Sequence, residues 1–562
     1  MSQRDRGPAA GAARARRATL RMPARAIGAV VVVAVVALAT LAVRARRDEQ
    51  GPLPSFRQQA CGLADDWLRL TRRGHFGPRS GQVALLPEQP AYMASGAGGW
   101  SHSGPWPYLT HVPLVFYGPG IVPARGDVDT AVTLADIAPT IATLLKGSLP
   151  ASDGAPLGAV ARLDARQMAG SSPKLVVTIV WDGGGWNVLE QWPNAWPNLR
   201  RMMAEGVSYT NASVGSSPSV TPAVHTTIGT GRFPSSHGIT GVPVRDESGE
   251  VVDAFLKGES SRFIQVPTLA ELWDEQSDDR ALIGMVGYEP WHLGMIGKGA
   301  EREGGDKDDA VWLNIETNEW ITNPEHYRLP PSIPATEGLE GDIERTDAAD
   351  GRVDGAWRDH AILDDPGRIE ELPGFIRYHE RALENLVRAE GYGRGGPTDL
   401  LFTNFKQIDR DGHYYNMASE EVRDTVVASD EALGAFLDFL DEEVGRGSYV
   451  VALTADHGQQ PDAPAVDGYG IDPNEVENDV NAEFGPIMRA VWPTEAFLYP
   501  DVMEERGVTV EEVARFLGDL RLEDNTKRPD IAVAGAGRFA ADDRLFALAI
   551  PAGMLPGLRC TE

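Results

Sequence analysis

Acidic residues and histidines follow three apolar runs of this sequence. Asp182 comes directly after "KLVVTIVW" (174–181), Asp409 and His413 follow "DLLFTNF" (399–405), and the pair Asp456 and His457 follows "SYVVALTA" (448–455). Carboxylates and imidazoles without sulfur form a ligand set that suits zinc. Five such ligands are too many for one four-coordinate ion with an open position, but they suit two ions. Two neighbouring divalent ions can stabilise both the attacking and the leaving oxygen of a phosphoryl transfer.

A hydroxyl nucleophile is expected near the first of these aspartates. The stretch "SPSVTPAVHTTIGTGRFPSSHGI" (217–239) places Thr221 before a proline at the start of a predicted helix. A hydroxyl at a helix N-terminus lies beside free backbone N–H groups at the positive end of the helix dipole, which favours a phosphoryl dianion. A metal ion on the threonine oxygen would lower its pKa. We therefore take Thr221 as the nucleophile and Ser219 as the alternative.

The three apolar runs are typical of buried parallel strands, whose two faces are both covered. The segment 419–444 lies between the second and third runs and has the apolar spacing of a long amphipathic helix. Strands that alternate with helices predict an α/β fold with a mostly parallel sheet. Ligands of such sheets bind beyond the carboxyl ends of the strands, so the acidic strand ends are expected to meet in one crevice. Residues from about 290 to 395 show no clear alternation, and we interpret them as a cap inserted over that crevice.

The N-terminus has the pattern of a membrane anchor. Seven arginines precede the uncharged stretch "AIGAVVVVAVVALATLAV" (26–43), which as a helix is about 27 Å long, near the lower limit for spanning a bilayer. Residues 1–47 are therefore predicted to form a cytoplasmic arginine-rich tail and a transmembrane helix, because basic residues favour the cytoplasmic side. The alternative is a secreted protein whose signal peptide is cleaved near "ALA" at 37–39. Both interpretations place the remaining chain outside the cytoplasm.

Charge and cysteine content narrow the partners and the compartment. The 562-residue chain has a formal net charge of −29, which argues against a nucleic-acid partner. Its two cysteines, Cys61 and Cys560, lie near the two ends of the predicted exported part. In an oxidising compartment they are expected to form a disulfide, although two separate thiols are also compatible with the sequence.

Four motifs together resemble one known family. In chain order, "VWDGGG", "SVTPAVHTTIGTGRFPSSHGI", "DRDGH" and "TADHG" resemble the alkaline phosphatase superfamily, and within it the type I phosphodiesterase/nucleotide pyrophosphatase branch. The resemblance covers roughly residues 174–460. It implies an alkaline-phosphatase-like core and two metal ions, zinc or in its place manganese or iron. One ion would be held by Asp182, Thr221, Asp456 and His457, and the other by Asp409, His413 and a third histidine.

The third histidine of this family normally lies downstream of the "DHG" element, in a loop before a "VPL" strand. No histidine follows His457 here, but "GWSHSGPWPYLTHVPLVFYGPGI" (99–121) resembles that loop and strand. It offers His102 as the ligand, with His111 as the competitor. The chain thus resembles a circular permutation, in which residues 48–170 correspond to the family's C-terminal part and residues 171–562 form the main catalytic part. The two cysteines would flank the point where the ancestral chain was continuous, since domain termini are often close together.

The resemblance implies hydrolysis of phosphoric esters, of the phosphodiester or nucleotide pyrophosphate type, through a phospho-threonine intermediate. The substrate would be a small molecule or a cell-surface phosphoester. Val242 stands where the family has a phosphate-contacting asparagine, and Lys298 is the candidate substitute. His225 and His237 are not ligands in the family, and we interpret them as structural. The alternatives are a phosphomonoesterase, a phosphonate hydrolase, or a transferase of phospho-groups to a cell-surface glycan or lipid. A catalytically silent binding module is least expected, because ligands and nucleophile are complete.

Overall fold

The computed structural model describes residues 53–93, 101–161, 172–302, 304–362, 366–525 and 539–560. The chain divides into two compact units, Met1–Pro54 and Ser55–Glu562, and the fold given below is that of the second unit. The predicted transmembrane helix at 26–43 lies outside the described residues. Within the described ranges, none of the helices combines the length and apolar character that crossing a membrane requires.

A mixed sheet forms the centre of the unit. In the described part of the chain it has ten strands, and β5 (Val132–Thr133) pairs with β7 beside the main path. The order along that path is β12 (Glu319–Ile321), β11 (Asp309–Asn314), β10 (Ile283–Val286), β15 (Asp399–Phe405), β6 (Leu175–Trp181), β16 (Tyr449–Thr454), β3 (His111–Tyr117), β7 (Val207–Ser213) and β4 (Gly126–Val128). Strands β11, β10, β15, β6 and β16 are parallel, whereas β3 is antiparallel to both β16 and β7. The predicted α/β fold with a mostly parallel sheet is confirmed.

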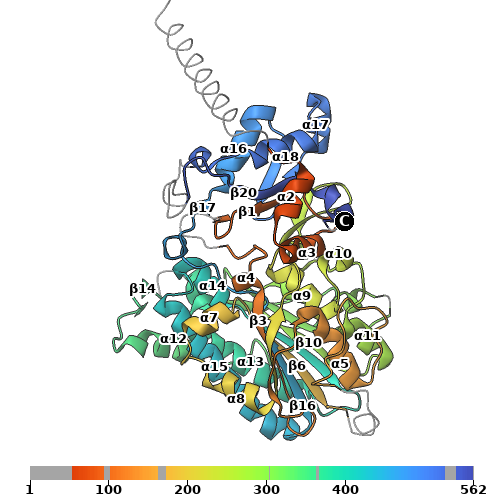
Figure 1. Ribbon diagram of the computed structural model, residues 1–562. Coiled ribbons are helices and arrows are strands. Elements are labelled where there is room, and N and C mark those ends of the chain that lie inside the picture. The colour runs from red at the N-terminus through yellow and green to blue at the C-terminus, as the bar shows by residue number, and fades with distance from the viewer. Residues whose placement is uncertain are drawn as a thin grey trace, which may run out of the picture. The chain divides into compact units, whose positions relative to one another are not determined.

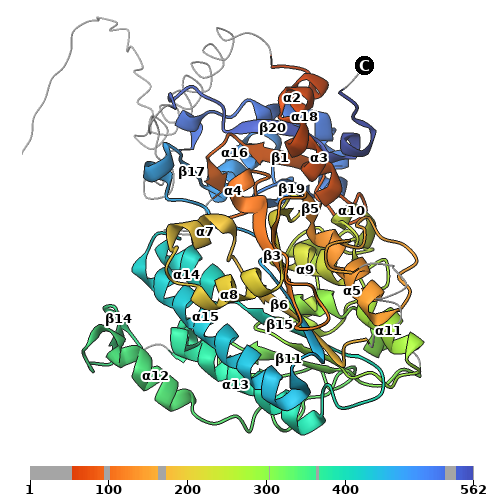
Figure 2. The ribbon, with the colours of Figure 1, turned by 60° about the horizontal axis from the view of Figure 1, so that its bottom comes forward.

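Strand β6 shows why the apolar runs form the middle of this sheet. Its side chains alternate between two hydrophobic clusters, with Val176 and Val180 in one and Leu175, Val177 and Ile179 in the other. Helices cover both faces, so every residue of the strand is buried. Figures 1 and 2 show α7, α8, α13 and α15 on one side of the central strands and α5, α9 and α11 on the other.

The helices around the central sheet lie between its strands along the chain, singly or in groups. Their bounds are α5 (Ile137–Leu145), α7 (Trp186–Gln191), α8 (Pro197–Glu205), α9 (Thr221–Thr230), α10 (Pro234–His237), α11 (Leu269–Gln276), α12 (Leu339–Asp347), α13 (Pro373–Glu390), α14 (Gln407–Tyr415) and α15 (Glu420–Leu440). Pro139 lies in the first turn of α5, where a missing backbone N–H costs little. Trp181, Trp186, Trp192 and Trp196 pack in or against the core on the α7–α8 side.

A second, antiparallel sheet has the order β18 (Met488–Trp492), β19 (Glu495–Leu498), β1 (Val83–Pro87) and β20 (Phe546–Pro551). It shares a hydrophobic core with α2 (Phe56–Gly62), α16 (Pro473–Phe484) and α18 (Val510–Gly518). The remaining helices are α3 (Asp65–Gly74), α4 (Pro107–Thr110) and α17 (Pro500–Arg506). Three strand pairs complete the fold: β8 (Pro243–Arg245) with β9 (Val251–Asp253), β13 (Ala356–Trp357) with β14 (His360–Ala361), and β2 (Tyr92–Met93) with β17 (Gly470–Ile471).

The predicted segments 48–170 and 171–562 do not fold separately. Strand β1 from the first segment lies between β19 and β20 of the second, and β3 lies between β16 and β7. Both sheets therefore contain strands from both segments. In the structure Cys61 and Cys560 form a disulfide with a Cα–Cα distance of 5.3 Å.

Part of the stretch 290–395, which the sequence analysis predicts to be an inserted cap, belongs to the central fold. This stretch supplies β11 and β12 at the edge of the central sheet, and α13, whose apolar face packs into the sheet's core. The 3-10 helix η4 (Pro290–Met295) packs against α9. No clear alternation marks these strands in the sequence, because β12 is only three residues long.

Candidate active site

The predicted site residues lie at one edge of the central sheet. Asp182 follows β6, and the pair Asp456–His457 follows the parallel neighbour β16. Strand β15, the neighbour on the other side of β6, leads into α14, which carries Asp409 and, one turn later, His413. Thr221 is the first residue of α9. The carboxyl ends of parallel strands thus bring these side chains together, as expected for such sheets.

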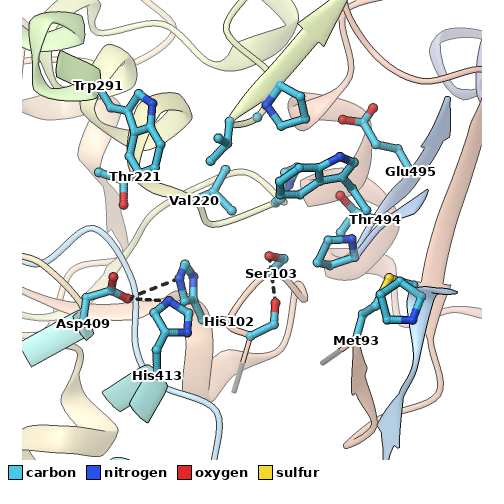
Figure 3. Close-up of a pocket in the computed structure, with 18 of the residues that line it drawn as sticks. Met93, His102, Ser103, Val220, Thr221, Trp291, Asp409, His413, Thr494 and Glu495 are labelled. Atoms are coloured by element: carbon cyan, nitrogen blue, oxygen red, sulfur yellow. Dashed lines mark hydrogen bonds and ion pairs between the residues drawn. The ribbon is translucent and has the colours of Figure 1, made fainter. Parts of the chain in front are cut away.

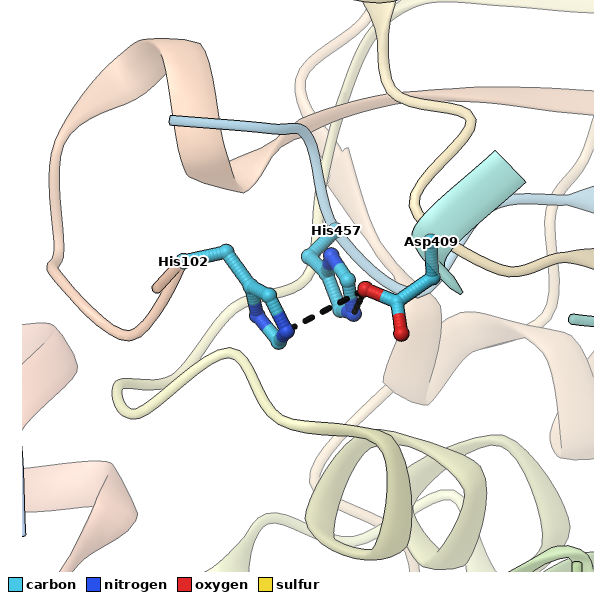
Figure 4. Close-up of side chains that lie close together, drawn as sticks. All are labelled: His102, Asp409 and His457. Carbon is cyan, nitrogen blue, oxygen red and sulfur yellow. Dashed lines mark ion pairs between the residues drawn. The ribbon is translucent and has the colours of Figure 1, made fainter. Parts of the chain in front are cut away.

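Three imidazoles converge on one carboxylate oxygen. The Nε2 atoms of His102 and His413 lie 3.3 Å from Asp409 Oδ1, and that of His457 lies 3.7 Å from it. Figures 3 and 4 show these rings directed at the carboxylate. The ring of His102 is stacked on that of His457 with centroids 3.5 Å apart. His102 therefore joins the ligand group from a loop that precedes it in sequence by about 300 residues.

Backbone carbonyls orient two of these rings. His102 Nδ1 donates to Ser219 O at 2.9 Å, and His457 Nδ1 donates to Gly458 O at 2.9 Å. A carbonyl only accepts, so the proton lies on Nδ1 in both rings and Nε2 faces the carboxylates with its lone pair when the ring is neutral. Such an outer hydrogen bond is the usual support of a metal-binding histidine. Ser219 Oγ also donates to His102 O at 2.8 Å, so this alternative nucleophile holds the His102 loop instead.

A second group surrounds the nucleophile. His457 Nε2 lies 3.4 Å from Asp182 Oδ1 and 3.6 Å from Asp456 Oδ2. Thr221 Oγ1 lies 3.5 Å from both carboxylate oxygens of Asp182. All four residues are buried.

The chemistry of these groups fits divalent metal ions. Asp409 Oδ1, Asp456 Oδ2 and His457 Nε2 are buried and make no hydrogen bond, although unpaired buried polar atoms are costly. The groups His102–Asp409–His457 and Asp182–Asp456–His457 each place their ligand atoms within 4.8 Å of one another. Burial lowers the pKa of His457, yet the carboxylates of Asp456 and Asp182 outweigh it and raise the pKa to about 9. The cluster thus favours a cation at this nitrogen.

Lys406, which the sequence analysis missed, lies between the two groups. Its Nζ donates to Asp182 Oδ1 at 3.0 Å and to Thr221 Oγ1 at 3.0 Å, and it lies 2.7 Å from Asp409 Oδ2. Burial alone would lower the pKa of this ammonium, but the carboxylates of Asp182 and Asp409 outweigh it and raise the pKa above its usual value. The signal in the sequence was a lysine at the end of an apolar strand, three residues before Asp409.

Lys298 is not part of the site, which corrects the expectation that it contacts the substrate. Its Nζ donates to Ile264 O at 2.8 Å, and it lines a different hollow together with Glu271 and Glu301.

The other histidines have separate roles. His111 Nε2 contacts Thr210 O at 2.8 Å, outside both ligand groups. His237 bonds Thr227 and the backbone of Ile239, which fits a structural role. His225 differs from its structural interpretation, because its Nε2 lies 3.5 Å from Asp456 Oδ2 and its ring can form a third ligand group with Asp182 and His292.

A pocket of about 410 Å³ opens in front of Thr221. Figure 3 shows Thr221, Asp409, His102 and His413 on one side and Glu495 and Thr494 on another. The apolar side chains that line the pocket include Val220, Val242, Pro243, Trp291 and Trp492. The turn between β18 and β19 of the antiparallel sheet thus faces the catalytic edge of the central sheet.

Comparisons with known proteins agree with this architecture. The family model for type I phosphodiesterase/nucleotide pyrophosphatase matches residues 176–528. Alkaline phosphatase PafA from Elizabethkingia meningoseptica is 27% identical over 334 residues, which cover 51% of this chain and 60% of that protein. Alkaline phosphatase PhoV from Synechococcus elongatus is 25% identical over 331 residues, covering 51% of this chain and 59% of that protein. This chain therefore spans about three fifths of each relative's length.

Among solved structures, the crystal structure of wild-type PafA resembles this fold with a TM-score of 0.53 and 21% identity. The match covers 62% of this chain and 76% of that one. At this identity the likeness concerns the fold.

Proposed function

This chain belongs to the type I phosphodiesterase/nucleotide pyrophosphatase family, and on that basis we propose that it hydrolyses phosphoric esters in a metal-dependent reaction with Thr221 as the nucleophile. The observation that carries the proposal is the position of the Thr221 hydroxyl. It is buried, it lies 3.5 Å from both oxygens of Asp182, and it faces the pocket that Asp409 and His413 also line.

Thr221 begins the chemistry from the N-terminus of α9. Its Oγ1 attacks phosphorus and passes its proton to solvent water, which supplies one to the leaving oxygen, and the bond from phosphorus to that oxygen breaks with its electron pair on the oxygen. The leaving group departs, and Thr221 carries the phosphoryl group. Backbone N–H groups of the first turn of α9 favour that negative charge. Water then attacks phosphorus, the bond to Oγ1 breaks, and the threonine is restored.

Two divalent ions are proposed to belong to this site. Asp182, Thr221, Asp456 and His457 would hold one, and Asp409, His413 and His102 the other; when bound they would supply Lewis acidity for the nucleophile and the leaving oxygen. Zinc is the proposed metal, because the donors are nitrogen and oxygen atoms and number three or four for each ion.

A phosphodiester is the favoured substrate class. The apolar lining of the pocket, which includes Val242 and Trp492, offers an ester substituent a surface that a bare phosphate group would not use. The second candidate is a phosphomonoesterase, favoured because PafA and PhoV are named alkaline phosphatases.

The chain arrangement is proposed to be a circular permutation. Support comes from His102 in the site, from β3 as the neighbour of β16, and from the disulfide that joins the two ends of the described unit. We further propose an extracytoplasmic location with residues 26–43 as the anchor. Its support is the N-terminal sequence, in which an arginine-rich segment precedes an uncharged apolar stretch.

The test uses the full chain loaded with zinc. Hydrolysis of bis-p-nitrophenyl phosphate and p-nitrophenyl phosphate is measured for the wild type, for Thr221→Ala and for Thr226→Ala. Thr226 is a matched control, because it is a buried threonine of α9 whose hydroxyl donates to Pro222 O at 2.7 Å. We expect a diester preference, loss of turnover only in Thr221→Ala, and a phosphorylated Thr221 in mass spectra of quenched wild type. A fully metallated wild type without turnover of either ester would point instead to a transferase or a binding role.

A further inference from the structure

The reacting oxygen of Thr221 is in contact with an ammonium group that the mechanism above does not use. Lys406 Nζ lies 3.0 Å from Thr221 Oγ1. The side chain is buried, and its two further partners, Asp182 Oδ1 and Asp409 Oδ2, fix the ammonium from two other directions. A charge held in this way needs no reorganisation when the reaction begins.

This contact is compatible with metal binding at the imidazoles. Asp409 presents Oδ1 to His102, His413 and His457, whereas it presents Oδ2 to Lys406. At Asp409 the ammonium and the imidazoles thus face different oxygens, whereas Asp182 Oδ1 faces both Lys406 Nζ and His457 Nε2.

No other pocket cation contacts the nucleophile among the described residues. The lysine and arginine side chains that line the pocket are Lys406 and Arg410. The guanidinium of Arg410 lies 4.0 Å from Glu370 and within 6 Å of the rings of Tyr288 and Tyr414. Val242, at the position where the resemblance predicts a phosphate-contacting asparagine, has no side-chain donor. Among the described residues, Lys406 is therefore the pocket cation for which the structure shows a contact with the nucleophile.

We propose that Lys406 is a catalytic residue that donates to Thr221 Oγ1 before the attack and to a non-bridging oxygen of the phosphoryl group during it. The proposal rests on the function proposed above. Non-bridging oxygens share their phosphorus with Oγ1 once the new bond forms, so a donor in contact with Oγ1 is within reach of them. Lys406 keeps its protons throughout, and no covalent bond of the lysine changes.

The experiment compares Lys406→Met, Lys406→Gln and Lys406→Arg with the wild type in the full, zinc-loaded chain. Lys298→Met is the matched control, since that lysine lines a separate hollow. Metal content, kcat and KM for the preferred ester, and binding of inorganic phosphate by calorimetry are measured for each. We expect kcat to fall by about 100- to 1,000-fold in the Met and Gln variants. Phosphate binding should weaken at least tenfold at unchanged metal content, with partial recovery in the Arg variant and no change in the control.

The phosphate measurement separates this inference from the proposed function. If the wild type turns over no ester but binds phosphate in a Lys406-dependent way, the hydrolase proposal fails and the phosphoryl contact stands. Phosphate affinity and kcat within threefold of wild type in both neutral variants would overturn the inference. A loss of kcat and phosphate affinity that excess zinc fully restores would also overturn it, because Lys406 would then only support the metal ligands. A wild type that binds no phosphate would overturn it as well.

Discussion

At the scale of single residues, the contact between His102 and Asp409 has a direct consequence for metal binding. Removal of the His102 imidazole takes away one of the three nitrogens that face Asp409 Oδ1. We expect His102→Ala to weaken the binding of one metal ion at least tenfold, measured by competition with a chromophoric chelator. His111→Ala is the control: His111 lies nine residues after His102 and bonds Thr210 O, so this variant should keep wild-type metal content. Equal metal affinity in both variants would contradict the assignment.

Glu495, on the pocket wall opposite the nucleophile, links stability to pH. Burial raises the pKa of this carboxyl to about 7 from 4.5, against the opposing effects of the Gly81 N–H, which donates to Glu495 Oε2 at 2.6 Å, and of Arg245. Between pH 4.5 and 7 the folded chain therefore keeps a proton that the unfolded chain has lost. This contribution to stability is complete below pH 4.5 and is lost as the pH rises towards 7.

The measurement is urea unfolding of wild type and Glu495→Gln at several pH values. Relative to the variant, the wild type should lose up to about 1.4 kcal/mol of unfolding free energy per pH unit in that window. The difference between the two proteins should be constant above about pH 7. Parallel curves across the whole range would show that Glu495 does not carry this proton.

The sequence was sufficient to predict most of these residues but not all. Asp182, Asp409 and Asp456 were recognisable because each follows an apolar strand, and parallel strands end at one edge. Whether Lys298 or Lys406 faces the nucleophile depends instead on tertiary packing. Lys298 donates to Ile264 O, away from the site. Lys406 lies between β15 and α14, at the edge of the sheet. Neither fact leaves a periodic pattern in the sequence.

At the scale of elements, the backbone of the turn after β6 lies close to neighbouring residues of the site. Gly183 has φ = +71°, its N–H donates to Asp456 Oδ1 at 3.1 Å, and a Cβ there would lie 2.2 Å from Gln459 Nε2 and 2.9 Å from Asp409 Cα. Position 183 therefore favours glycine for two reasons, its positive φ and the lack of space for a Cβ.

Gly183→Ala is expected to displace Asp409 and Asp456 and to weaken metal binding at least tenfold. Gly249→Ala is a matched control, because Gly249 also has a positive φ of 88° but nothing within 4 Å of an added Cβ. Both variants should lose about 1–2 kcal/mol of unfolding free energy from the backbone alone. Competition with a chelator measures the metal affinity of the two variants, which only Gly183→Ala should lower. Unchanged metal affinity in Gly183→Ala would contradict the prediction.

Element prediction succeeded where both faces of a strand are buried and failed at the sheet's edge. The apolar runs of β6, β15 and β16 gave a continuous signal because helices cover both faces. The two-residue and three-residue strands, such as β12 and β14, carry too few residues for any period. The order of the strands depends on long-range pairing, which is why the place of β11 and β12 in the central sheet was not predicted.

At the scale of the whole molecule, the proposed permutation predicts that the older chain order still folds. Ser55 lies six residues before Cys61, about 9 Å along a helix, and Cys61 Cα is 5.3 Å from Cys560 Cα. A linker of about six residues from Cys560 to Ser55 therefore spans the gap. A rearranged chain that begins at Ser172, passes through this linker and ends at Ala161 should fold, bind the same number of metal ions and keep kcat within tenfold. An insoluble or metal-free product would count against the permutation.

The disulfide between Cys61 and Cys560 turns the catalytic unit into a covalent ring, because it joins positions 499 residues apart. A protease that cuts one peptide bond inside a ring opens it without releasing a fragment. With a cleavage site engineered into the exposed turn at Ser248, between β8 and β9, the cut protein should migrate as one species without reductant and as two with it. A molecule exposed to proteases would in this way survive a first cut in one piece.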